Sequence, residues 1–221
     1  MSGAFGEFVE VESAPGNADF FRRLQDSPSR FSPHRHTLAP PPPAGLFLAP
    51  LWREGQRIPY MSALTALDAS DNETRSYLEI AEFLRREGSR VNEDLHQLWR
   101  RIVFNMLVSN TDDHLRNHGF LRDAKGWRLA PAYDLNPVPT DVKPRIHALA
   151  IDEIDGTASL DTAFQIAPMF GMTEKNARAI AAEVGSAVAG WRDAAARFGN
   201  TSDKVERMAS AFDHEDLKAA T

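Results

Sequence analysis

A strongly apolar helix that ends directly at a dense polar loop constrains the fold of this chain more than any other feature. Apolar side chains recur at helical spacing after Asn92, the expected N-cap: Leu95, Leu98, Trp99, Ile102, Val103, Met106 and Leu107. So wide a stripe is typical of a helix buried in a core. Residues 109–118 then hold two aspartates, two histidines and two asparagines. Ionisable groups gathered where a buried element ends indicate a functional site.

The rest of the pattern predicts a mainly α fold, α+β overall, with one small β-hairpin. Helical periodicity extends over residues 73–87, where Gly88 ends it, and over 160–170, 173–198 and 203–212, with Thr173 as a start signal. Short apolar segments on either side of Asp123–Gly126 predict the hairpin. Proline-rich loop follows it over residues 133–144.

The first 56 residues differ from the rest in composition. Residues 27–50 are rich in proline, which occupies positions 28, 33, 40–43 and 50. Proline lacks the amide donor that helices and central strands use, so this stretch is expected to be irregular. We therefore divide the chain into an irregular arm, residues 1–56, and a helical lobe, residues 57–221.

Charge and composition exclude several classes of function. The net charge of −6 disfavours direct binding of nucleic acid or of an anionic membrane, because both need clustered basic residues. There is no cysteine, which excludes disulfides and thiolate chemistry and fits a reducing compartment. No apolar run approaches the roughly 20 residues of a membrane span, and Met1–Glu7 lacks the features of a secretory signal. We expect a cytoplasmic protein.

Three polar residues have the spacing of a phosphoryl-transfer site. Asp112 and Asn117 are five positions apart, as are the catalytic aspartate and the metal-binding asparagine in the protein-kinase loop H-R-D-x-x-x-x-N. Such an aspartate accepts the proton of the attacking hydroxyl, and such an asparagine holds Mg²⁺. Asp134 follows the predicted hairpin, in the place of the kinase D-F-G aspartate, between the apolar neighbours Tyr133 and Leu135.

The ordered set of these motifs resembles the HipA family of toxin kinases. The likeness rests on Asn110-Thr111-Asp112-Asp113-His114, on Asn117, and on Ala130-Pro131-Ala132-Tyr133-Asp134 after the hairpin. Arg57–Ala63 and Ser76–Ala81 are similar to the family as well, so that the resemblance extends over residues 57–198. It implies the fold of a kinase-like C-terminal lobe of HipA type.

Carried over by position, the resemblance implies a role for each residue of the loop. Asp112 would be the catalytic base, Asn117 and Asp134 would bind Mg²⁺, and Asp113 would orient the loop. The nucleotide would be lined by His114, Leu115, Arg116, Asn117, Tyr133 and Asp134. The resemblance also implies ATP as phosphoryl donor, a protein serine or threonine as acceptor, and a small DNA-binding antitoxin as partner.

One part of the kinase pattern is absent from the sequence. A kinase needs a phosphate-covering loop and a lysine that grips the α/β-phosphates, both before the catalytic loop. The first lysine here is Lys125, and no glycine-rich loop precedes it. The simplest interpretation is a C-lobe without its N-lobe, with weak or absent activity by itself. Arg53 or Arg57 is a candidate substitute for the lysine.

Two alternatives remain open. In the first, the chain is an inactive binding module that docks an antitoxin or a separate N-lobe protein. Alternatively, His114 and His118, four positions apart, share a helical face with Asp113 nearby and hold the metal ion of a hydrolase.

Overall fold

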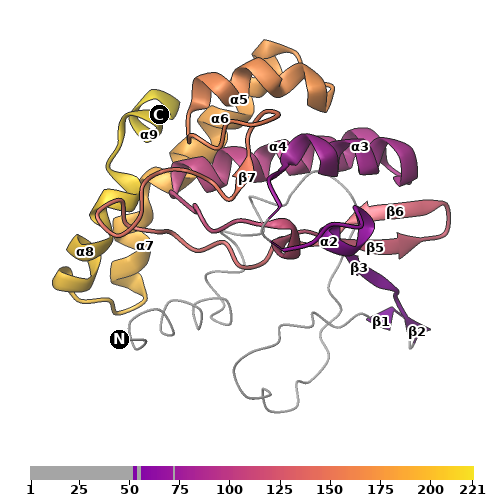
Figure 1. The fold of residues 1–221 in the computed structure, drawn as a ribbon. Coiled ribbons are helices and arrows are strands. Elements are labelled where there is room, and N and C mark those ends of the chain that lie inside the picture. The colour runs from indigo at the N-terminus through magenta and orange to yellow at the C-terminus, as the bar shows by residue number, and fades with distance from the viewer. Residues whose placement is uncertain (1–51, 54–55, 72) are drawn as a thin grey trace.

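The computed structural model describes residues 52–53, 56–71 and 73–221 (Figure 1). The predicted arm of residues 1–56 lies almost entirely outside these described residues. At its end, β1 and β2 pair as short antiparallel strands. No helix in the described part of the chain is both long enough and apolar enough to cross a membrane.

The predicted fold class is confirmed: the lobe is mainly α, with short strands (Figure 1). The α-helices are α2 Ala63–Ala66, α3 Tyr77–Glu87, α4 Val91–Leu107, α5 Leu160–Ile166, α6 Glu174–Ala189, α7 Trp191–Arg197, α8 Ser202–Phe212 and α9 Glu215–Ala220. Two 3-10 turns are η2 Leu115–Asn117 and η3 Ala167–Phe170. The strands are β1 Trp52–Arg53, β2 Gln56–Arg57, β3 Tyr60–Ser62, β4 Arg75–Ser76, β5 Gly119–Asp123, β6 Gly126–Leu129 and β7 Leu149–Ala150.

Helix α4 is the centre of the core, as its apolar stripe predicts. Trp99 is fully buried, and its indole donates a hydrogen bond to the Ala163 carbonyl on α5 at 3.2 Å. The helix contacts α3, α5, α6, α9 and β6. The predicted N-cap at Asn92 is wrong, because the amide of Asp94 already bonds to the Arg90 carbonyl and the helix begins at Val91.

Helix α3 begins four residues later than predicted. Residues 75–76 are used instead as β4, which pairs in parallel with β7. The helix begins directly after this strand because the Glu79 carboxylate accepts a hydrogen bond from the Ser76 amide at 3.4 Å and caps the first turn of α3. The predicted end at Gly88 is confirmed.

The predicted hairpin is confirmed as β5 and β6, and β3 completes a three-stranded antiparallel sheet in the order β3-β5-β6. Glycine is needed at Gly126 because the hairpin lies against the end of α3: a Cβ there would stand 2.6 Å from the Glu87 carbonyl oxygen. The Ser89 amide also donates to the Trp127 carbonyl at 2.9 Å. The turn after α3 therefore fixes where the hairpin lies.

Of the C-terminal helices, α5, α6 and α9 pack on α4, whereas α7 and α8 lie farther from it and contact each other (Figure 1). Thr173 caps α6, as predicted, by accepting a hydrogen bond from the Asn176 amide at 3.3 Å. The helix predicted over residues 173–198 is two helices, α6 and α7, which meet at Gly190. Trp191 stacks on Phe212 of α8, with ring centroids 4.3 Å apart.

Candidate active site

Hydrogen bonds hold the first two residues of the polar loop, Ser109 and Asn110, directly after α4. Ser109 has a left-handed conformation, with φ of 53°, and its buried hydroxyl donates to the Ala211 carbonyl at 2.8 Å. The Asn110 amide bonds to the Asn105 carbonyl at 2.8 Å, and the Asn110 side chain donates to Asn105 Oδ1 at 3.1 Å. A loop tied to both α4 and α8 holds its side chains in defined places.

Asp113 is buried beneath the loop, where one oxygen of its carboxylate meets three polar side chains. Its Oδ2 accepts from the Tyr77 hydroxyl at 2.5 Å and from Asn105 Nδ2 at 2.8 Å, and lies 2.8 Å from His118 Nε2. Burial acts to raise the pKa of this carboxyl, but His118 and the hydrogen bonds outweigh it and hold the pKa below its usual value. This geometry suits a residue that orients the loop.

Asp112, the preceding residue, has the opposite environment. Its side chain is 75% exposed, and Lys143 Nζ lies 3.4 Å from its Oδ1. The loop therefore turns one aspartate inward as an anchor and leaves the other exposed to solvent.

Asn117 and Asp134 meet although they are 17 residues apart. Asn117 Nδ2 donates to Asp134 Oδ2, and Asn136 Nδ2 donates to Asp134 Oδ1 at 2.6 Å. Asp134 has a left-handed backbone, with φ of 57°, which turns its carboxylate back toward the loop.

Their oxygen atoms suit a hard divalent cation. Mg²⁺ is bound by one or two carboxylates together with other oxygen ligands and water. Asn117 Oδ1 accepts from the His114 amide at 3.0 Å, which leaves its second lone pair for a metal ion. The donor set of Asn117 and Asp134 therefore fits Mg²⁺.

The remaining residues expected around a nucleotide differ in accessibility. His114 and Arg116 are exposed, whereas Leu115 is only 4% exposed and belongs to the core. Arg116 pairs with Asp71 at 2.5 Å. The Tyr133 hydroxyl donates to the Arg116 carbonyl at 2.5 Å and lies 2.7 Å from the Tyr60 hydroxyl.

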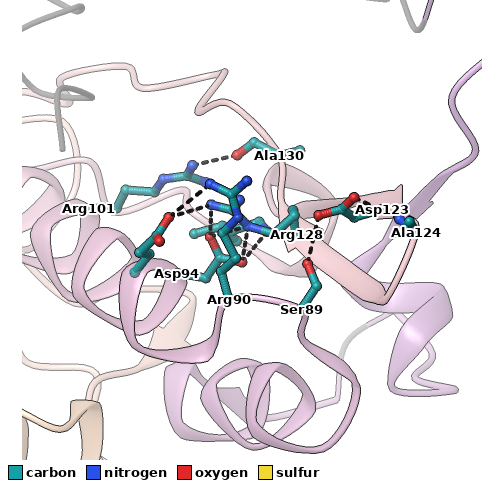
Figure 2. Close-up of polar contacts among 10 residues, drawn as sticks. Ser89, Arg90, Asp94, Arg101, Asp123, Ala124, Arg128 and Ala130 are labelled. Atoms are coloured by element: carbon teal, nitrogen blue, oxygen red, sulfur yellow. Dashed lines mark hydrogen bonds and ion pairs between the residues drawn. The ribbon is translucent and has the colours of Figure 1, made fainter. Parts of the chain in front are cut away.

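A network of arginines holds the strand that leads to Asp134 (Figure 2). Arg128 on β6 reaches Asp94 on α4 with Nε–Oδ2 and Nη2–Oδ1 distances of 2.8 and 2.9 Å, and the Leu129 amide donates to the same carboxylate. Arg101 donates to the Ala130 carbonyl just beyond the strand. Burial lowers the pKa of the Arg101 guanidinium to about 10, and the charges of Asp113 and Asp94 oppose that shift.

The sequence reasoning missed two residues that lie beside the loop. Segment 147–149 runs next to it, because the Ala148 amide donates to the Thr111 carbonyl at 3.1 Å. His147 is buried there, and neither of its ring nitrogens has a hydrogen-bond partner of good geometry, although the Asn110 backbone lies near enough to favour the protonated ring. Burial lowers the pKa of His147 to about 4. The other missed residue is Lys143.

The alternative metal site of a hydrolase, on His114, His118 and Asp113, is not assembled. His114 and His118 do not share a helical face, because only Leu115–Asn117 form a 3-10 turn and both histidines are extended. His114 is exposed, whereas His118 is buried against Asp113. Among the described residues no group of three or more histidine, cysteine, aspartate or glutamate side chains is arranged to hold a metal ion.

A family model and two relatives match this chain. The family model described as "HipA-like C-terminal domain" matches residues 45–191. The "Putative kinase Y4mE" of Sinorhizobium fredii is 37% identical over 60 residues, which are 27% of this chain and 14% of that protein. A "Putative kinase" of Haemophilus influenzae is 32% identical over 101 residues, 43% of this chain and 29% of that protein.

A similar fold occurs in a solved structure of the Shewanella oneidensis toxin–antitoxin system HipA, in complex with HipB and its operator DNA. The TM-score is 0.54 at 18% identity, over 74% of this chain and 43% of that one. The chain thus spans well under two thirds of the length of each of these relatives. Because the family model covers most of the described lobe, this chain belongs to the family of HipA-like C-terminal domains.

Proposed function

We propose that this chain carries the ATP- and Mg²⁺-binding catalytic site of a serine/threonine protein kinase of HipA type, acting in the cytoplasm. The observation that carries the proposal is the pairing of Asn117 with Asp134 at the same loop that exposes Asp112. Both the family and the names of the similar proteins support a kinase.

The proposed reaction assigns each residue one task. The hydroxyl oxygen of a protein serine or threonine attacks the γ-phosphorus of ATP, the bond from that phosphorus to the β–γ bridging oxygen breaks, and ADP leaves. Asp112 orients the hydroxyl and accepts its proton. Asn117 and Asp134 would hold Mg²⁺, which would supply positive charge against the phosphates. Backbone groups of residues 114–116 and the Tyr133 side chain line the nucleotide.

A second role, docking to another protein, is supported by two observations. The first lysine of the chain is Lys125, so the group that grips the α/β-phosphates in a kinase is absent before the loop. The related HipA was solved together with HipB and operator DNA. We propose that an antitoxin of that kind, or a protein that supplies an N-lobe, binds this chain, and that the net charge of −6 leaves DNA contact to the partner.

Calorimetry with ATP and Mg²⁺ tests the first proposal. Asp134→Asn removes the charged metal ligand while asparagine tolerates the left-handed backbone, so Mg²⁺-dependent binding is expected to fall by about 10- to 100-fold with the fold intact. Asp112→Asn is the matched control: it should bind ATP like the unaltered chain and lose phosphoryl transfer. No binding at millimolar ATP, or equal binding by the Asp134 variant, contradicts the proposal.

A further inference from the structure

The segment after Asp134 returns to the catalytic loop and is fixed to it at both ends. The Val138 amide donates to the Ser109 carbonyl at 3.2 Å, and the Ala148 amide donates to the Thr111 carbonyl at 3.1 Å. Between them, the Thr140 amide donates to Ser210 Oγ on α8 at 3.1 Å. The turn over residues 139–143 therefore has a defined place beside the loop.

This turn brings a lysine to the expected catalytic base. Lys143 Nζ lies 3.4 Å from Asp112 Oδ1 and 3.4 Å from the Thr111 carbonyl oxygen. Arg145, two residues on, is anchored by its pair with Asp216 at 2.7 Å and by the Met106 carbonyl at 3.0 Å. The chain on either side of Lys143 is thus held in place, while the Lys143 side chain remains 44% exposed.

We propose that Lys143 is the cation that contacts the phosphoryl group in transfer, an inference that rests on the proposed kinase function. An ammonium group beside the base that receives the hydroxyl proton stands where the γ-phosphoryl group must pass. Negative charge on the equatorial phosphoryl oxygens is stabilised by a positioned donor at that point. Lys143 transfers no proton in this step; the proton of the acceptor hydroxyl goes to Asp112, and the broken bond leaves its electrons on ADP.

The contact between Lys143 and Asp112 is weak enough for Lys143 to exchange this carboxylate for a phosphate. At 3.4 Å, with the Asp112 side chain 75% and the Lys143 side chain 44% exposed, it is a loose pair rather than a fixed one. An incoming phosphate, with more charge than a carboxylate, can draw the ammonium from Asp112 and leave that carboxylate free to accept a proton. Arg116 is less available, because it pairs with Asp71 at the short distance of 2.5 Å.

A comparison of ATP with ADP tests the role of Lys143 apart from the rest of the site. Calorimetry on the full chain with Mg²⁺ would compare Lys143→Met, Lys143→Arg and Lys125→Met, the last a matched control in the exposed hairpin turn. Since only ATP has the γ-phosphoryl group, Lys143→Met should weaken ATP binding about tenfold and leave ADP binding unchanged. Lys143→Arg should restore most of the ATP affinity. Where transfer is measurable, Lys143→Met should lower kcat by about 100-fold.

The outcomes separate this inference from the proposed function. If Lys143→Met binds ATP as tightly as the unaltered chain, while Asp134→Asn does not, Lys143 is only a surface partner of Asp112 and the kinase site stands. Equal weakening of ATP and ADP by Lys143→Met also overturns the inference, because the effect is then not on the γ-phosphoryl group. If the unaltered chain binds neither nucleotide, both proposals are wrong.

Discussion

Asp112 and Asp113 are neighbours with opposite surroundings, and this contrast yields a test at the scale of single residues. Asp113→Asn places an amide donor among the donors of Tyr77, Asn105 and His118, so at least one buried hydrogen bond is lost. We expect a loss of about 3 kcal/mol in the free energy of unfolding, measured by urea denaturation. Asp112→Asn, 75% exposed, should change it by no more than about 0.5 kcal/mol.

Equal stability of the two variants would contradict the buried anchor described for Asp113.

The sequence predicts the types of residue in this loop because Asp112 and Asn117 belong to one contiguous motif. It does not predict Lys143, which contacts Asp112 from 31 residues away, or Tyr77, which contacts Asp113 from 36. Such contacts depend on the path that the chain takes between the two residues, and no local pattern in the sequence indicates that path.

At the scale of elements, the site depends on how the β5–β6 hairpin is fixed to α4. Arg128→Met leaves the Asp94 carboxylate, 2% exposed, without its charged partner (Figure 2). Burial already raises the pKa of Asp94 against the effect of Arg128. We expect a loss of about 3 kcal/mol in the free energy of unfolding and weaker binding of ATP with Mg²⁺, because Asp134 follows this hairpin. Urea denaturation and calorimetry measure the two effects.

Arg122→Met is the control on the same hairpin, because Arg122 is exposed and lies over the Trp127 ring at 5.4 Å. It should leave both quantities nearly unchanged. Arg128→Lys should not restore stability, since lysine cannot give the two parallel hydrogen bonds that the guanidinium makes. Full stability of Arg128→Lys would show that charge alone, without the fork geometry, holds the hairpin.

The elements that the sequence predicts well are those with local signals. The apolar stripe predicts α4, and two short apolar segments around a glycine turn predict the hairpin. The start of α3 was predicted too early because β4 pairs with β7, more than 70 residues away, and nothing local indicates a two-residue strand. Helix α9, with six residues, is too short to show a periodic pattern.

At the scale of the whole molecule, two histidine side chains are largely buried where segments distant in the sequence meet. His147 lies just before β7, in a segment that is hydrogen-bonded to the polar loop, and His214 lies before α9 with its Nε2 3.2 Å from the Leu107 carbonyl at the end of α4. Burial lowers the pKa of both, that of His147 to about 4. The folded molecule therefore resists protonation at two places where distant segments meet.

This predicts that the protein loses stability as the pH falls through the weakly acidic range. Above pH 6.5, His147 is neutral in both the folded and the unfolded chain, and it makes no difference. Between pH 6.5 and about 4, the unfolded chain binds a proton that the folded chain does not, so the unfolded state is favoured increasingly as the pH falls. At pH 5 this costs about 2 kcal/mol relative to pH 7.

Urea denaturation at pH 7 and pH 5 measures the effect. His147→Leu, which fills a similar volume and removes no hydrogen bond of good geometry from the ring, should be less sensitive to this change by about 2 kcal/mol. His96→Leu, on the partly exposed side of α4, is the control and should keep the pH dependence of the unaltered chain. Because His214 also has a lowered pKa, some acid sensitivity should remain in His147→Leu. An unchanged pH dependence in His147→Leu would mean that this ring takes up its proton as readily in the folded chain as in the unfolded one.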